Sequence, residues 1–559
     1  MMKTFTNLLC VLTFALFTSS VWAGDFEDGI SAYEKKDYVT AHKKFKIGAS
    51  QGNEEAQLYL GVMSDLGRGV TQNYAEAMRW YKLAAAQGNA DAQVNIGLLY
   101  RTGRGVAQDY AEAMRWYKLA AVKNNSDAQV NVGWMYDQGN GVAQDYAEAM
   151  RWYKLAAAQG NATAQNNIGG MYQEGTGVVQ DYAEAMRWYK LAAAQGKAKA
   201  QLNIGLMNDL GRGVTQSYAE AMRWYKLAAA QGNADAQVNI GLLYRTGRGV
   251  AQDYAEAMRW YKLAAAKGNA DAQVNVGWMY DQGTGVAQDY AEAVRWYKLA
   301  AAQGYARAQN NLGAMYQEGN GVAQDYAEAM RWYKLAAAQG NARAQNNLGD
   351  LYEDGKGVAQ DYAEAMRWYK LAAAKDNSDA EFNLGWLYHQ GHGVAPDYAE
   401  AMRWYKLAAA KGDEYAQVNI GDMYQDGNGV AQDYAEAMRW YKLAAVQGST
   451  RAQNNIGALY EDGKGVAQDY AEAMRWYKLA AAQGNTDAQF NIGQMYDEGN
   501  GIAQNFVRAH MWSNLSALNG DAYSVRLRDS VAAKMTPQQI VEAQKMASEC
   551  QAKNFKNCD

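Results

Sequence analysis

The stretch YAEAMRWYKLAAAKGNADAQVNVGWMYDQGTGVAQD, residues 254–289, is one copy of a 36-residue unit that recurs along the chain. An aromatic residue begins each copy at an unvarying step of 36, from Tyr38 to Tyr470 and then at Phe506. Residues 38–505 therefore span 468 residues, which is thirteen units without an insertion or deletion. A fixed period of this length predicts a solenoid built from stacked repeats.

The pattern within each unit indicates two helices, which we name helix B and helix A. In helix B, apolar residues such as Ala257, Met258 and Tyr261 recur at three- and four-residue spacing, as in an amphipathic helix. Helix A is expected from Asp271 to Gln282. Gly277 lies inside it, and a glycine in the middle of a helix predicts a close helix crossing that a methyl group would block.

The consensus A-Q-x-N-[IVL]-G-x-[ML]-Y-x-x-G-x-G-V-x-x-D-Y-x-x-A-x-x-W-Y-x-x-A-A-x-x-G resembles the Sel1-like repeat, a longer relative of the tetratricopeptide repeat. The resemblance covers nearly the whole chain after residue 23. It implies an all-α fold, a right-handed superhelical α-α solenoid of about 13 to 14 repeats that is used for protein-protein contacts. Family members often occur in bacterial envelope or host-interaction proteins, and the resemblance does not indicate which partner is bound.

Four segments are expected along the chain. The first has a positively charged start, an apolar core too short to span a bilayer and a small-residue cleavage site, which is typical of a secretory signal peptide. We therefore expect an exported protein, periplasmic or secreted, without stable membrane insertion after signal cleavage. The segments are a signal peptide (1–23), an N-terminal partial repeat (24–37), thirteen repeats (38–505), and a degenerate repeat with a C-terminal capping helix (506–559).

The only cysteines after the predicted signal peptide are Cys550 and Cys558. In an oxidising compartment they most simply form a local disulfide in the C-terminal tail, with free thiols as the main alternative. The family includes cysteine-rich members with a disulfide in each repeat and a proposed penicillin-binding activity. This sequence departs from those members in every repeat.

Motifs for catalysis, cofactors or metals are not recognisable in the sequence. His389 and His392 share one loop and could bind a metal, but ordinary loop variation is the simpler interpretation. We therefore expect no enzymatic activity, no cofactor and no metal site. The net charge of -5 and the lack of a basic stripe argue against nucleic acid as a partner.

Differences between copies indicate a candidate binding surface. In helix A the positions equivalent to Asp271, Val274, Trp278 and Asp281 vary freely, and their spacing places them on one helical face. Core positions do not exchange Trp for Asp, as the Trp278 column does. In a superhelix of this class the A helices line the concave surface. This face is therefore expected to escape the packing constraint.

Five residues of the Trp278 column are candidate binding residues. Trp134, Trp278 and Trp386 are candidate anchors, because an exposed Trp provides a large desolvated contact. The alternative is that they cover neighbouring alanines. Asp350 and Asp422 make the later repeats more acidic, although charges on a solvated face usually have no further role. The thirteen tryptophans of helix B are expected in the core.

An asparagine recurs once per unit beside this stripe, for example at Asn131, Asn275 and Asn383. An Asn amide has both a donor and an acceptor, so a ladder of asparagines could pair with the backbone of an extended peptide of any sequence. The alternative is that each Asn stabilises the turn between its own helices.

These features predict a noncatalytic scaffold or adaptor that binds a protein or peptide along the concave face. Two alternatives stay open. One is an enzyme that binds or hydrolyses β-lactams, like the cysteine-rich relatives. The other is an envelope scaffold that binds glycan, which only the abundant Tyr and Trp suggest.

Overall fold

The computed structural model describes residues 24–556 and Cys558. Within this part of the chain every regular element is a helix, and no strand is present. The protein is therefore an all-α solenoid, as the 36-residue period predicts. The predicted signal peptide, residues 1–23, lies outside the described residues.

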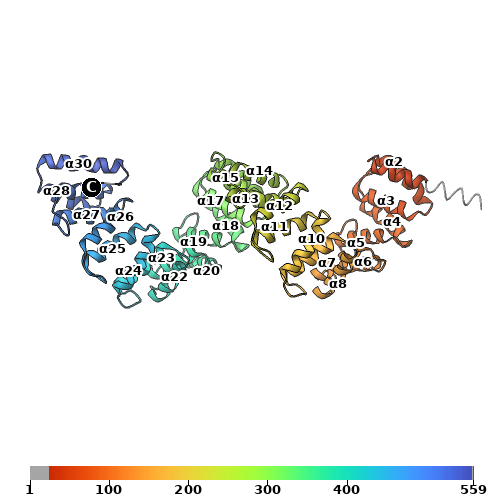
Figure 1. Cartoon of the computed structure of the whole chain (residues 1–559), viewed down its shortest axis with the longest axis horizontal. Coiled ribbons are helices and arrows are strands. Elements are labelled where there is room, and N and C mark those ends of the chain that lie inside the picture. Colours follow the sequence, from red (N-terminus) through yellow and green to blue (C-terminus); the bar gives the residue numbers. More distant parts are fainter. Residues whose placement is uncertain (1–23, 557, 559) are drawn as a thin grey trace, which may run out of the picture. The chain divides into compact units, whose positions relative to one another are not determined.

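B and A helices alternate along the chain (Figure 1). The B helices are α2 Tyr38–Ser50, α4 Tyr74–Ala86, α6 Tyr110–Ala121, α8 Tyr146–Ala158, α10 Tyr182–Ala194, α12 Tyr218–Ala230, α14 Tyr254–Ala265, α16 Tyr290–Ala302, α18 Tyr326–Ala338, α20 Tyr362–Ala373, α22 Tyr398–Ala410, α24 Tyr434–Val446, α26 Tyr470–Ala481 and α28 Phe506–Ser516. The A helices are α3 Glu54–Leu66, α5 Ala90–Thr102, α7 Ser126–Gln138, α9 Ala162–Glu174, α11 Ala198–Leu210, α13 Ala234–Thr246, α15 Ala270–Gln282, α17 Ala306–Glu318, α19 Ala342–Asp354, α21 Ser378–Gln390, α23 Glu414–Asp426, α25 Thr450–Asp462 and α27 Thr486–Glu498.

Polar caps define where the helices begin and end. Asp253 precedes α14, and its side chain accepts a hydrogen bond from the Glu256 backbone N–H. After helix B the chain takes a left-handed residue, which is Gly in most repeats. Asn124 and Asp376 replace it with φ of 62° and 60°. These are residue types that tolerate the left-handed region, so the backbone path is the same in every repeat.

The core of each repeat is built around a tyrosine of helix B. Tyr153, like its equivalents in the repeats before the last B helix, is fully buried between its own helix and the preceding A helix. A Cβ added at Gly133 would lie 2.7 Å from the Tyr153 ring. The prediction that the mid-helix glycine marks a close helix crossing is therefore confirmed.

The helix-B tryptophans differ from their predicted position. Trp512 is buried, but Trp116 and the other members of the column are only half-buried. Trp116 packs on the core formed by α4 and α5, in the preceding repeat, and the Arg115 guanidinium lies 5.3 Å from its ring centroid. The prediction of a core role is confirmed for Trp512, whereas the other rings pack on the cores and stay half-buried, some of them, such as Trp116 and Trp404, beneath an arginine guanidinium.

The chain divides into two compact units. The first holds the described residues up to Val276 with Thr284–Val286, and the second holds Gly277–Gly283 with the residues from Ala287 onward. Within each unit, A helices pack most extensively on the B helix that follows them, as α3 does on α4 and α23 on α24. This pattern of contacts between sequence neighbours is typical of a solenoid.

Both ends of the repeat array are covered. A helix at residues 24–34 packs Phe26, Ile30 and Tyr33 on the first repeat. At the other end, η1 Ala517–Asn519 and α29 Ala522–Ala532 precede α30 Pro537–Ala552. Thr536 caps α30, with Pro537 as its first residue. A disulfide joins Cys550 to Cys558 beside the C-terminal core.

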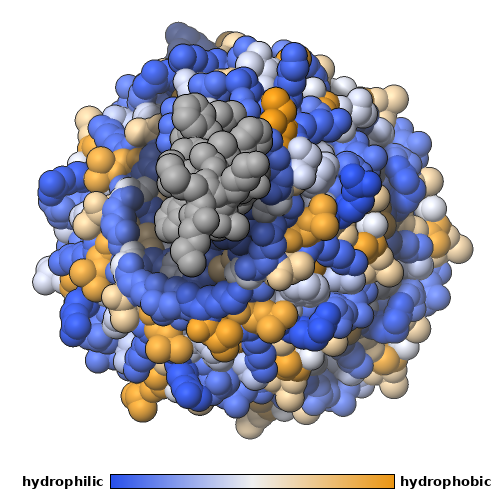
Figure 2. Space-filling model, turned by 90° about the vertical axis from the view of Figure 1, so that its right-hand side faces the viewer, coloured by the Kyte–Doolittle hydropathy of each residue, from blue (hydrophilic) through white to orange (hydrophobic). Residues whose placement is uncertain are grey.

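Exposed apolar side chains are dispersed over the surface. On the face in Figure 2, hydrophobic residues lie in small groups among hydrophilic ones. The largest regular set is a leucine column of the B helices that includes Leu155 and Leu407. Among residues 24–556, no helix combines the length and the apolarity that a membrane span requires.

Candidate interaction surface on the A helices

Two of the variable columns form an accessible surface. The Asp271 column is exposed in every repeat except at Thr163, which is half-buried. The Trp278 column is half-buried in every repeat except at Trp386, which is 38% exposed. We call the surface made by these two columns the A-helix face.

The Val274 column does not belong to this face. Val274 is fully buried, and Leu58, Leu202 and Val418 in the same column are buried as well. These side chains pack in the cores, as Leu202 does with the helices of the repeat that follows it. The prediction that this column escapes packing is therefore wrong, because its residues vary in size but face the neighbouring repeat.

The Asp281 column provides acceptors for the buried tyrosines. The Tyr189 hydroxyl donates to Gln173 at 3.1 Å, and Tyr225 donates to Asp209 at 3.0 Å. Asp, Glu and Gln can all accept this bond, so the column varies within one chemical class. Sequence reasoning missed this role because it counted identities and not acceptors. Arg101 and Arg245 are exceptions, since a guanidinium cannot accept a hydrogen bond, and the column also holds His389.

The three candidate tryptophans lie on different A helices. Trp134 on α7 is half-buried, and the Arg101 guanidinium lies 4.8 Å from its ring centroid. Trp278 on α15 is also half-buried, whereas Trp386 on α21 is exposed. The structure therefore places them as separate contact points, with the largest accessible ring at Trp386.

Asp350 on α19 is not a freely solvated charge. Its Oδ1 accepts hydrogen bonds from the Tyr369 hydroxyl at 2.8 Å and from Asn383 Nδ2 at 3.1 Å, and Asn346 Nδ2 donates to its Oδ2. Burial raises the pKa of Asp350 to about 7. The solvated-face interpretation is therefore wrong for this residue.

Asp422 on α23 is also held within the fold. Its carboxylate accepts from the Tyr441 hydroxyl at 2.7 Å and forms an ion pair with Arg451 at 2.5 Å. Burial raises the pKa of Asp422, while Tyr441 and Arg451 lower it. Its charge is therefore matched by a neighbouring cation and is not available as a free anionic contact.

Several asparagines of the column connect successive A helices. Asn203 Nδ2 donates to Asn166 Oδ1 at 3.2 Å, and Asn383 makes the equivalent bond to Asn346. Asn131 donates to the Asp127 carbonyl at 3.0 Å, and Asn275 is 7% exposed. These bonds use N–H groups that a peptide ladder would need. We therefore interpret the asparagines as structural residues between A helices and no longer as a ladder that binds a peptide backbone.

A polar hollow of about 360 Å³ opens on the A-helix face between α7, α9 and α11. Trp134 lines it from α7, Gly170 from α9 and Lys199 from α11. A Cβ at Gly170 would meet only the Tyr189 hydroxyl, at 3.8 Å. The missing side chain at Gly170 therefore leaves accessible space in a column that is filled in the adjacent repeats.

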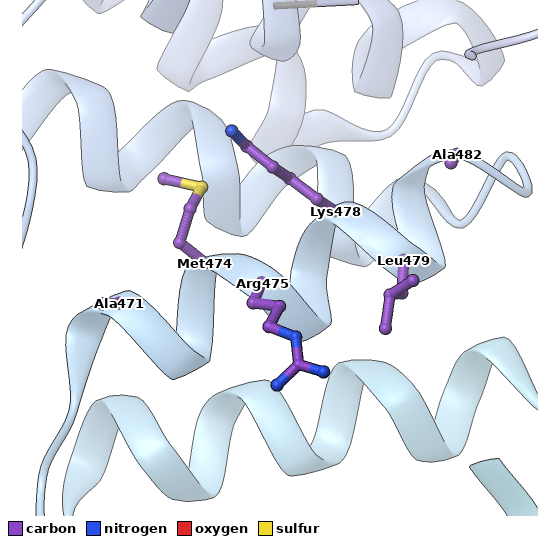
Figure 3. Close-up of a pocket in the computed structure, with 6 residues that line it drawn as sticks. All are labelled: Ala471, Met474, Arg475, Lys478, Leu479 and Ala482. Carbon is purple, nitrogen blue, oxygen red and sulfur yellow. The ribbon is translucent and has the colours of Figure 1, made fainter. Parts of the chain in front are cut away.

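A second hollow, of about 450 Å³, runs along a single B helix, α26 (Figure 3). The same columns line an equivalent hollow on α8. Because these columns hardly vary between repeats, the feature is a general property of the unit and does not distinguish one repeat from another. Its lining residues on α26 are Ala471, Met474, Arg475, Lys478, Leu479 and Ala482.

The two histidines predicted in one loop pack against tyrosine rings, and His389 lies in the last turn of α21. His392 lies 4.6 Å from the Tyr362 ring centroid, and His389 lies 5.4 Å from that of Tyr398. Burial lowers the pKa of His389. Within residues 24–556 and Cys558, no group of three His, Cys, Asp or Glu side chains is arranged to hold a metal ion.

The Sel1 repeat family matches thirteen consecutive 36-residue segments between residues 54 and 521, and the chain belongs to this family. Each matched segment begins with helix A, whereas the unit described above begins with helix B. The count of complete repeats is the same in both registers.

Two similar proteins have solved structures. One is a protective antigen present in uropathogenic Escherichia coli strains, 36% identical over 80% of this chain and 96% of that chain, with a TM-score of 0.62. The other is a Sel1 repeat protein from Oxalobacter formigenes, 38% identical over 45% of this chain and 100% of that chain, with a TM-score of 0.42. No curated protein matches the chain.

Proposed function

We propose that the protein is a noncatalytic scaffold that binds a protein or peptide along the A-helix face. The observation that carries this proposal is the contrast between a constant frame and a variable surface. Every A helix has thirteen residues, although the Trp278 column contains side chains as different as Trp386, Gly170 and Asp350. Such a frame presents different contact chemistry in each repeat, which suits an extended partner.

The Asp271 column supports the same proposal. Its exposed side chain is Asp91 on α5, Lys199 on α11, Arg343 on α19 and Tyr415 on α23. Charge and aromatic character therefore change along the face, whereas buried columns such as those of Ala272 and Gly277 keep one residue type. Variation at accessible positions is compatible with recognition and costs the fold little.

We also propose that the chain is exported to the periplasm or secreted. The support is the signal-like pattern of residues 1–23 and the similarity to a bacterial protein described as a protective antigen. Export would bring the A-helix face into contact with envelope or extracellular proteins.

A capture experiment tests the proposed surface. The chain from residue 24 onward is immobilised beside a variant carrying Trp134→Ala, Trp278→Ala and Trp386→Ala and exposed to envelope extract. A control variant carries Leu155→Ala, Leu299→Ala and Leu407→Ala, which are exposed on B helices. We expect the tryptophan variant to lose a captured protein that the parent and the leucine variant retain. Equal capture by all three would contradict binding at these tryptophans.

A further inference from the structure

The packing of α9 does not require glycine at position 170. Gly170 lies inside α9 with an ordinary helical φ, and an added Cβ would make only an ordinary contact at 3.8 Å. The adjacent members of its column are Trp134 and Leu206, and Ala314 occupies the position 144 residues later. A mid-helix Gly costs about 1 kcal/mol relative to Ala. Gly170 therefore provides open space on the A-helix face.

Two carboxylates line the hollow. Asp137 comes from α7 and Glu174 from the last turn of α9, and neither forms an ion pair among the described residues. The cation in the lining is Lys199 on α11, which is exposed and donates to neither carboxylate. The lining therefore has one ammonium group and two carboxylates without an ion pair, of which Asp137 accepts a hydrogen bond from Gln138 Nε2 at 3.2 Å. A cation that enters the hollow can form charge-assisted hydrogen bonds with them.

The aromatic wall of the hollow also favours a cation. Arg101 from α5 already stacks on Trp134, at 4.8 Å from the ring centroid, so this ring holds a guanidinium within the fold. Trp134 lines the hollow together with Tyr153 of α8, Tyr189 of α10 and residues of α9 and α11. The hydrocarbon stem of a long basic side chain can lie against such a ring while its charged end reaches the carboxylates.

We infer that the hollow between α7, α9 and α11 is a subsite for one basic side chain, Lys or Arg, of the bound partner. The volume of about 360 Å³ accommodates one large side chain. An acidic side chain would face Asp137 and Glu174, and an apolar one would leave the polar lining unpaired. The inference rests on the proposed function and adds the chemistry of one contact.

Selection from a random dodecapeptide library displayed on phage tests this inference, with the chain from residue 24 onward as the target. Three variants accompany the parent. Gly170→Leu fills the hollow with a residue that the same column holds at Leu206, and Glu174→Gln removes one charge. Ala194→Leu adds the same side chain at an exposed position at the end of α10, outside the A-helix face. Circular dichroism verifies that each variant is folded.

We expect the selected peptides to share a basic residue. Replacement of that residue by Gln, and the Gly170→Leu and Glu174→Gln variants, should each weaken binding about tenfold, with Ala194→Leu unchanged. Peptides that bind Gly170→Leu as tightly as the parent, or that lack a basic residue, would overturn the subsite and leave the scaffold proposal in place. A parent that selects no peptide would overturn both.

Discussion

Gly169 and Gly170 are adjacent in α9 and are glycine for opposite reasons. A Cβ at Gly169 would lie 2.6 Å from the Tyr189 ring. This distance is shorter than real Cβ contacts, so the ring or the helix would have to move. A Cβ at Gly170 would be 3.8 Å from its nearest neighbour, the Tyr189 hydroxyl. The first glycine is required by the core, and the second leaves the surface open.

Alanine substitutions separate these two roles. Gly169→Ala should destabilise the repeat by about 1–3 kcal/mol through overpacking, although it removes a helix-propensity penalty of about 1 kcal/mol. Gly170→Ala should stabilise α9 by up to about 1 kcal/mol. Native-state hydrogen exchange of the α9 amides measures both effects locally. Equal destabilisation by the two variants would contradict the packing account.

Asp350 and Glu353 compete for one hydroxyl group. The Tyr369 oxygen lies 2.8 Å from Asp350 Oδ1 and 2.7 Å from Glu353 Oε2. A hydroxyl has one proton, so both short contacts are hydrogen bonds only when one carboxyl is protonated. Burial raises the pKa of Asp350 to about 7 from its ordinary value of 3.8, and it raises the pKa of Glu353.

The stability of this repeat should therefore depend on pH. The folded protein binds the Asp350 proton more tightly than the unfolded chain does, so its stabilising contribution is present at low pH and is lost as pH rises toward 7. Relative to the parent, Asp350→Asn should become more stable as pH increases from about 5 to 8. Thermal unfolding of both proteins measures the difference, with Asp487→Asn as an exposed control on α27. A difference that does not change with pH would contradict the account.

At the scale of helices, a pair of glutamines joins consecutive units. Gln87 Nε2 donates to Gln57 Oε1 at 2.9 Å, and the bond recurs in later repeats. At α21 and α22 the pair is replaced by Glu381 and Lys411, whose charged groups are 2.8 Å apart. Glu381 is 3% exposed, so its charge depends on this partner.

Substitution back to glutamine tests the pair. Lys411→Gln should destabilise the α21–α22 repeat by about 2 kcal/mol, because it leaves a buried carboxylate without a cation. Adding Glu381→Gln should restore most of that loss by recreating the pair found in the other repeats. Chemical denaturation of the single and double variants gives the coupling energy. Additive effects would show that the two side chains are not coupled.

The helices and their close crossing could be predicted from the sequence, because the columns of Tyr261 and Gly277 recur every 36 residues. A strictly repeated pattern of this kind is compatible with one packing of helix A on helix B. It did not predict which neighbour a variable side chain meets. Val274 varies and is buried, because hydrophobic residues of several sizes fit between repeats. The Asp281 column varies because residues of several types can accept the tyrosine hydrogen bond, as Asp281 does from the Tyr297 hydroxyl at 3.2 Å. The hollow at Gly170 was missed because it results from an absent side chain.

At the scale of the whole molecule, each repeat is stabilised by its neighbours, so damage at the C-terminal end should stay local. Replacing Cys550 and Cys558 by Ser should increase hydrogen exchange in α30, where Cys550 is part of the terminal core. Exchange in α3 should not change. Faster exchange throughout both compact units would contradict this view, and unchanged exchange in α30 would show that the disulfide is not needed there.

The central claim is that partners bind the A-helix face, and site-specific photocrosslinking tests it most directly. Benzoylphenylalanine is placed at Trp386 or Tyr415 on the A-helix face and, as controls, at the exposed B-helix residues Leu371 or Leu407. After exposure to envelope extract and irradiation, we expect the two A-helix positions to crosslink to the same protein and the two B-helix positions not to. Crosslinking from the B-helix positions alone, or from none of the four, would contradict the account.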